Sequence, residues 1–169
     1  MSDNPKILIE TSMGDITVEL YPEKAPKTVK NFLEAVRNKH YDDTVFHRVI
    51  KGFMVQGGGM NAEMKEKAWK KQPIKNEAAT GVSNERGAIA MARTGDPHSA
   101  TVQFFINTVD NEHLNHSSPT PAGYGYCAFG KVTEGMDVVD AIEDVATTSK
   151  GFHDDVPEES VIIKSIRKA

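Results

Sequence analysis

An arginine interrupts an apolar segment at a position where its side chain could take part in binding or catalysis. Residues 46–58 read F-H-R-V-I-K-G-F-M-V-Q-G-G, with Arg48 inside a strand-like apolar pattern. Charged side chains are almost never fully buried unless they are paired, so Arg48 should face a cleft or solvent. If residues 51–52 form a turn, the two halves pair antiparallel and place Arg48 near Gln56, with Met54 on the same face as Gln56. Such a surface combines a guanidinium, an amide and an apolar side chain, but an edge-strand arginine that keeps the sheet edge soluble explains the spacing equally well.

Three other groups of chemistry-bearing residues have plainer explanations. The glycines at 57–59 are not followed by the lysine and hydroxyl residue of a phosphate-binding loop, which favours glycines at a strand end or bulge. The segment D-N-E-H-L-N-H at 110–116 has two histidines that zinc could use, but it lacks an obvious third strong ligand. The segment D-P-H-S at 96–99 holds catalytic-triad residue types without a G-x-S-x-G context, so turn chemistry is favoured there.

Composition excludes several classes of protein. A length of 169 residues fits a single domain over residues 1–169. The chain has 20 lysines and arginines against 24 aspartates and glutamates, a formal charge of −4, so nucleic acid is not expected as the main partner. The single cysteine, Cys127, leaves no disulfide framework and no multi-cysteine zinc site. The sequence has no secretory signal pattern and no run of about 20 apolar residues, so we expect a cytoplasmic protein without a membrane partner.

The elements that must position these residues are mostly short strands. Apolar residues alternate over 6–20 around Gly14-Asp15, which has turn chemistry and predicts a β-hairpin. Apolar residues at i, i+3, i+4 and i+7 predict a helix over 25–38, with Pro26 in its first turn and with Phe32 and Leu33 packed in the core. The remaining expected elements are strands at 45–50, 53–56, 87–92, 102–107, 126–132 and 161–166, and a second helix at 136–145.

Two stretches lack strong periodicity. We expect loops at 60–85, where one or two helical turns could form at 62–70, and at 111–125. Because strands and helices do not alternate, a parallel α/β fold is disfavoured. The pattern favours an antiparallel barrel or sandwich that is capped by helices.

Segment 46–58 resembles the signature of the cyclophilin-type peptidyl-prolyl cis-trans isomerases. The likeness extends along nearly the whole chain in the same order, and is greatest to the compact single-domain bacterial members. The further segments that carry it are A-P-K-T-V-x-N-F (25–32), R-G-x-I-A-M-A (86–92), S-A-T-V-Q-F-F-I (99–106), F-G-K-V (129–132) and G-M-D-V-V-D (135–140). The resemblance implies a mainly β fold, an eight-stranded antiparallel closed barrel capped by two α-helices.

The same resemblance implies an enzyme that rotates X–Pro peptide bonds and assists protein folding. Its partners would be proline-containing peptides and unfolded or folding proteins, and it would act as a monomer with no cofactor and no metal. By position, Arg48 is the catalytic arginine and Gln56 steadies it. The substrate-binding positions that the resemblance implies are Phe53, Met54, Ala92, Arg93, Gln103, Phe105, His113, Leu114 and Tyr126.

Some positions depart from the best-known eukaryotic pattern. His113 stands where those members carry tryptophan, and Tyr126 stands where they carry histidine. Because that tryptophan matters for cyclosporin, we expect weak cyclosporin binding, whereas Tyr126 keeps a polar aromatic tip that should preserve catalysis. Arg93 replaces a smaller polar residue and should alter the neighbouring subsite. Two alternatives stay open: a proline-peptide binding module or chaperone with little turnover, and a barrel that binds a small molecule.

Overall fold

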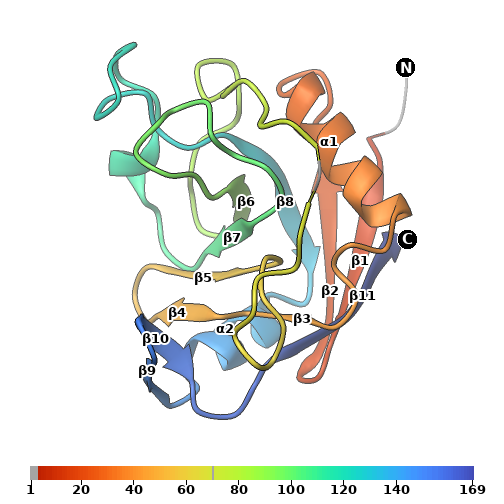
Figure 1. Cartoon of the computed structure of the whole chain (residues 1–169). Coiled ribbons are helices and arrows are strands. Elements are labelled where there is room, and N and C mark those ends of the chain that lie inside the picture. The colour runs from red at the N-terminus through yellow and green to blue at the C-terminus, as the bar shows by residue number, and fades with distance from the viewer. Residues whose placement is uncertain (1–3, 70) are drawn as a thin grey trace.

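A curled antiparallel sheet with a helix at each end forms the molecule (Figure 1). The structure is a computed structural model that describes residues 4–69 and 71–169. Within them, nine strands form the main sheet and two more form a separate hairpin. In spatial order the main sheet consists of β3 (Thr44–Val45), β11 (Ile162–Lys168), β1 (Lys6–Thr11), β2 (Gly14–Leu20), β8 (Ala128–Glu134), β6 (Ala88–Met91), β7 (Phe104–Asn107), β5 (Met54–Gly57) and β4 (Arg48–Ile50). The other elements are α1 (Pro26–Arg37), α2 (Met136–Glu143), the 3₁₀ turn η1 (Glu112–Leu114), and the hairpin of β9 (Thr147–Lys150) and β10 (His153–Pro157).

The curl of the sheet follows from how its edge strands are connected. β3 and β4 lie at opposite edges of the main sheet, yet only Phe46 and His47 separate them in the chain. The backbone N–H of Phe46 donates to the carbonyl of Val161, 3.0 Å away, next to β11. The sheet must therefore curl until its two edges meet. The predicted mainly β, antiparallel fold with two helices is confirmed, although the described residues contribute nine strands rather than eight.

The first hairpin has its turn two residues earlier than predicted. Thr11 pairs with Gly14, so Ser12 and Met13 make the turn and Gly14 already begins β2. The Thr11 hydroxyl donates to the Gly14 carbonyl at 2.7 Å and accepts from the Met13 N–H at 3.1 Å. A threonine side chain thus supplies the turn hydrogen bonds that the glycine pair was expected to supply.

Helix α1 closes one end of the curled sheet with an aromatic side chain. Phe32 is fully buried, and its ring centroid lies 5.2 Å from Tyr41, 5.9 Å from Phe104 and 5.2 Å from Phe129. The predicted core role of Phe32 is confirmed, whereas Leu33 is only partly buried. The interior is filled by side chains, as expected for a barrel of this size.

The structure contains one hairpin that was not predicted, and it confirms most of the long loop that was. The β9–β10 hairpin was not predicted, because T-T-S-K has no apolar alternation. The long polar stretch at 60–85 is confirmed as loop in its described residues, and the helical option at 62–70 is wrong for 62–69; residue 70 lies outside the described residues. Within the described chain, no helix is long and apolar enough to cross a membrane.

Candidate active site

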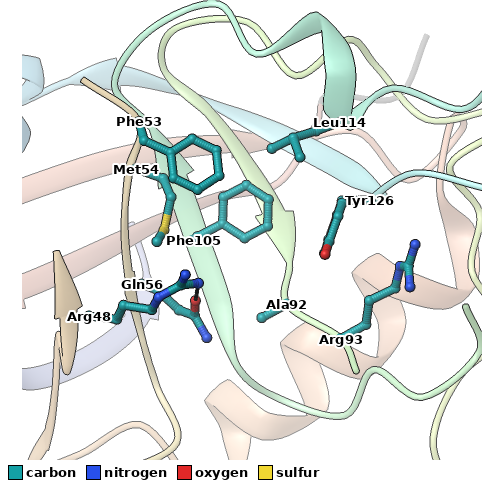
Figure 2. Close-up of a pocket in the computed structure, with 9 residues that line it drawn as sticks. All are labelled: Arg48, Phe53, Met54, Gln56, Ala92, Arg93, Phe105, Leu114 and Tyr126. Carbon is teal, nitrogen blue, oxygen red and sulfur yellow. Dashed lines mark hydrogen bonds between the residues drawn. The ribbon is translucent and has the colours of Figure 1, made fainter. Parts of the chain in front are cut away.

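The period of two along β5 and β7 creates a pocket on the outer face of the sheet. Val55 points into the main core, so Met54 and Gln56 point outward, and Phe105 follows the same rule between Phe104 and Ile106. Figure 2 shows the nine side chains of the resulting pocket, with Arg48 and Gln56 at one side, Phe105 in the middle and Tyr126 at the other. They are Arg48, Phe53, Met54, Gln56, Ala92, Arg93, Phe105, Leu114 and Tyr126.

A polar row borders the pocket on the β4 side. Arg48 and Gln56 are register partners, which confirms that they lie near each other. Because Ile50 pairs with Met54, the turn covers residues 51–53 and is one residue longer than the expected turn at 51–52. The Arg48 guanidinium donates from Nη1 to Gln56 Oε1 at 3.4 Å, and Gln56 Nε2 donates to Gln103 Oε1 at 3.1 Å. Arg48 is exposed, and none of the ion pairs among the described residues includes it. Its charge therefore faces the pocket mouth without a carboxylate to neutralise it.

Aromatic and aliphatic side chains form the floor and walls. Met54, Phe105 and Leu114 are buried, with 2%, 4% and 7% of their surface exposed. The rings of Phe105 and Tyr126 meet edge to face, with centroids 5.7 Å apart and planes at 79°. Because aromatic rings are rigid, these walls form a preshaped apolar site.

His113 and Gln103 lie beside the pocket rather than among its lining residues. His113 stacks on Phe53, with centroids 5.8 Å apart and planes at 26°, and it is exposed. Gln103 contacts the pocket through its hydrogen bond to Gln56. All eleven residues singled out from the sequence therefore lie in or next to a single pocket.

Arg93 braces the far wall of the pocket. Its guanidinium carbon lies 4.5 Å from the ring centroid of Tyr126. It also donates to three backbone carbonyls, those of Gly125 at 3.0 Å, Thr94 at 2.8 Å and Pro121 at 3.1 Å. Arg93 thus ties the irregular segment that follows β6 to the loop that precedes Tyr126.

The glycines at 57–59 are explained by close packing. Gly57 ends β5, which confirms the expected strand end. Gly58 has a φ of +91°, a backbone conformation that suits glycine. A Cβ atom at Gly59 would lie 2.4 Å from Cγ of Gln103, so only glycine lets Gln103 reach Gln56.

The other candidate segments make local contacts instead of a second site. His116 Nδ1 bonds the carbonyl of Tyr124 at 2.8 Å. In the turn at 96–99 the Ser99 hydroxyl donates to the Asp96 carbonyl at 2.6 Å, and the His98 N–H donates to the Asp96 carboxylate at 2.9 Å. Across the described residues, no three His, Cys, Asp or Glu side chains lie together as a metal-binding group.

Sequence reasoning missed a buried histidine next to Arg48. His47 is 6% exposed, and within the described part of the chain its Nδ1 has no hydrogen-bond partner. Burial, followed by the nearby charges of His153 and Arg48, lowers the pKa of His47 to about 4. Cys127 is a buried thiol whose pKa burial raises to about 11, as expected of an unreactive core residue.

Comparisons with known proteins agree with this geometry. Residues 6–168 match the sequence profile of the cyclophilin type peptidyl-prolyl cis-trans isomerases. Peptidyl-prolyl cis-trans isomerase B of Escherichia coli is 56% identical over 160 residues, covering 95% of this chain and 97% of that protein. A peptidyl-prolyl cis-trans isomerase of Acinetobacter baylyi is 52% identical over 164 residues, covering 97% of this chain and 85% of that one. A crystal structure of a Cryptosporidium parvum cyclophilin type isomerase in the presence of the dipeptide Ala-Pro superposes with a TM-score of 0.76 at 28% identity, covering 97% and 98% of the two chains.

Proposed function

The chain belongs to the cyclophilin-type peptidyl-prolyl cis-trans isomerases, and from that premise we propose that the pocket beside Arg48 is where it rotates X–Pro bonds. The observation that carries this proposal is the unneutralised guanidinium of Arg48, held by Gln56 at the mouth of an apolar pocket. The pocket walls would hold the proline ring while the chain on one side of the bond turns. The substrates are then proline-containing peptides and unfolded or folding proteins.

The reaction needs a donor and no bond cleavage. Amide resonance resists twisting, with a barrier of about 18–20 kcal/mol. In the twisted state the proline nitrogen loses conjugation and becomes a hydrogen-bond acceptor. A donor aimed at that nitrogen binds the twisted form better than either planar form, which is the requirement for catalysis. An arginine suits this role because it stays protonated and presents several donors in a rigid fork.

The size of the effect shows why Arg48 needs the rest of the pocket. A 10⁵-fold acceleration requires about 7 kcal/mol of extra transition-state stabilisation. One charge-assisted hydrogen bond contributes roughly 1.5–3 kcal/mol, and preorganised donors in a shielded site contribute more. The remainder must come from holding the substrate on both sides of the bond. The Ala92 N–H already donates to the Gln103 carbonyl at 2.9 Å, so we propose that the carbonyl of Ala92 receives the substrate N–H.

Exchange spectroscopy on an Ala-Pro peptide tests the proposal directly. With the protein present at a few per cent of the peptide concentration, we expect cis–trans exchange to become much faster than the uncatalysed tens to hundreds of seconds. Peptide signals that shift on binding while the exchange rate stays unchanged would instead identify a proline-peptide binding module. The charge-bearing row at the pocket mouth favours the enzyme over that alternative.

Replacing Gly59 with alanine should weaken catalysis although Gly59 does not itself line the pocket. The new methyl group would displace the Gln103 side chain and break its bond to Gln56. Loss of one hydrogen bond, about 1 kcal/mol, predicts a roughly fivefold lower kcat/KM in the exchange assay. Gly95→Ala is the matched control, because nothing lies within 4 Å of a Cβ there. Equal activity of the two variants would show that Gln103 does not support Gln56.

Replacing His113 with tryptophan should increase cyclosporin affinity. We propose that weak cyclosporin binding follows from the histidine at this position, since it stacks on Phe53 at the pocket edge with a smaller ring. A tryptophan buries more apolar area, so we expect roughly tenfold tighter binding by calorimetry. Turnover of the Ala-Pro peptide should change by less than about twofold, because the exposed ring lies outside the catalytic row. An unchanged dissociation constant would contradict this assignment.

Three further expectations accompany the proposal. The single domain over 1–169, the monomeric state and the cytoplasmic location that the sequence predicts stay predictions.

A further inference from the structure

Three buried asparagines form a continuous hydrogen-bonded chain beneath the pocket. Asn84, Asn107 and Asn111 are 1%, 0% and 4% exposed, which is unusual for this polar side chain. Asn111 Nδ2 donates to Asn107 Oδ1 at 2.7 Å, and Asn107 Nδ2 donates to Asn84 Oδ1 at 3.1 Å. Because an amide side chain both donates and accepts, these bonds run without a break from Asn111, directly before η1, through Asn107 on β7 to Asn84 in the loop before β6.

Both ends of this asparagine chain reach pocket walls. At one end Asn111 Nδ2 also donates to the carbonyl of Phe53 at 3.0 Å. At the other end Asn84 Nδ2 donates to the carbonyls of Tyr126 at 3.0 Å and Leu114 at 3.3 Å. These three acceptors belong to the turn before β5, the segment before β8 and the end of η1.

The asparagine chain therefore connects walls that are far apart in sequence. Phe53, Leu114 and Tyr126 all line the pocket. Their backbones lie outside the strands, and the Tyr126 N–H donates to the Leu114 carbonyl at 2.8 Å, which joins those two walls. Among the described residues, no backbone hydrogen bond joins either of them to Phe53. Buried, fully connected polar networks are rigid, because breaking one bond leaves a desolvated group without a partner. The buried asparagine side chains thus link the Phe53 wall to the walls of Leu114 and Tyr126.

We propose that Asn84, Asn107 and Asn111 are positioning residues that hold the proline pocket at its binding width, an inference that rests on the proposed function. They act on walls that contact the proline ring in the planar and twisted states alike. Loosening these walls weakens ground-state and transition-state binding together, which raises KM and leaves kcat largely intact. This signature differs from that of Arg48, whose bond forms only in the twisted state.

Asn111→Ala is the main test. It removes the side-chain bond to Phe53 and leaves the backbone N–H of Asn111 on the carbonyl of Asn84, at 2.7 Å in the wild type. For an Ala-Pro peptide we expect KM to rise about tenfold and kcat to stay within about twofold, since misplacement of binding groups is costly in a preorganised site. Asn111→Ser, which keeps one donor, should recover part of the loss.

A matched control separates positioning from stability. Asn31 is also buried, 7% exposed, and donates to the Thr101 carbonyl, but it lies on α1 away from the pocket. Asn31→Ala should lower the melting temperature and leave KM unchanged, because partial unfolding reduces only the amount of active protein. If Asn111→Ala behaves in the same way, with KM unchanged and only the maximal rate reduced, the proposal is overturned.

Titration of the peptide followed by NMR keeps this result separate from the catalytic proposal. If the wild type binds the peptide without accelerating exchange, the proposed function fails. A tenfold higher dissociation constant for Asn111→Ala would still support the positioning role. If Asn111→Ala binds as tightly as the wild type, the positioning role fails whatever the exchange rate. Wild type that neither binds nor accelerates exchange overturns both proposals.

Discussion

Arg48→Ala is expected to lower kcat for an Ala-Pro peptide by at least about 100-fold, in line with the loss of one preorganised transition-state donor. The guanidinium is exposed, is held by Gln56 at 3.4 Å and takes part in none of the ion pairs of the described residues. Removing it should therefore leave the fold intact. Because the bond to the proline nitrogen forms only when the amide twists, peptide affinity should change much less than kcat.

Arg48→Lys separates charge from geometry. Lysine retains the positive charge but loses the rigid fork that Gln56 accepts from, so we expect it to recover less than about a tenth of the wild-type rate. Exchange spectroscopy gives kcat, and a titration followed by NMR gives the dissociation constant. An Arg48→Ala enzyme with a kcat within a few-fold of wild type would falsify the assignment of Arg48 and require another donor at the pocket mouth.

The sequence predicted the fold where side chains alternate regularly. Ile7, Ile9 and Ile16 follow a period of two and are fully buried, as the hairpin prediction requires. Where burial is set by distant segments, prediction failed. The polar β9–β10 hairpin has no local signal, and the turn at Ser12-Met13 depends on one threonine hydroxyl rather than on the glycine that follows.

Only one part of the site could be derived from spacing. The expected turn at 51–52 brings Arg48 near Gln56, and the observed turn at 51–53 pairs the two residues directly. The aromatic walls Phe53, Phe105 and Tyr126 come from three separate segments, so their grouping was implied by the family resemblance and not by local pattern. The asparagine chain and His47 had no signal, because the burial of a polar side chain is decided by what packs over it.

His47 predicts an unusual loss of stability in mild acid. Its pKa in the folded protein is lowered to about 4, with burial as the largest cause, from an ordinary value of 6.5. The imidazole is 6% exposed, and inside the described chain its Nδ1 has no partner to share a second proton with. Protonation of the folded form is therefore unfavourable.

The direction of the effect follows from which state binds the proton first. Below pH 6.5 the unfolded chain gains a proton at His47 that the folded chain does not take up until about pH 4. The stability is therefore complete above pH 6.5, falls as the pH drops towards 4, and levels off below it. A difference between 6.5 and 4 corresponds to roughly 3 kcal/mol in the free energy of unfolding.

Urea denaturation from pH 7.5 to pH 4 can isolate this contribution. Burial also lowers the pKa of His40, so the wild-type curve contains more than one histidine. Subtracting the free energy of unfolding of His47→Gln from that of the wild type at each pH removes the contribution of the other histidines. We expect this difference to decline by roughly 3 kcal/mol across the range. A difference curve for His47→Gln that stays flat would mean that the buried imidazole accepts a proton as readily as an unfolded one, and that His47 does not make the fold acid-sensitive.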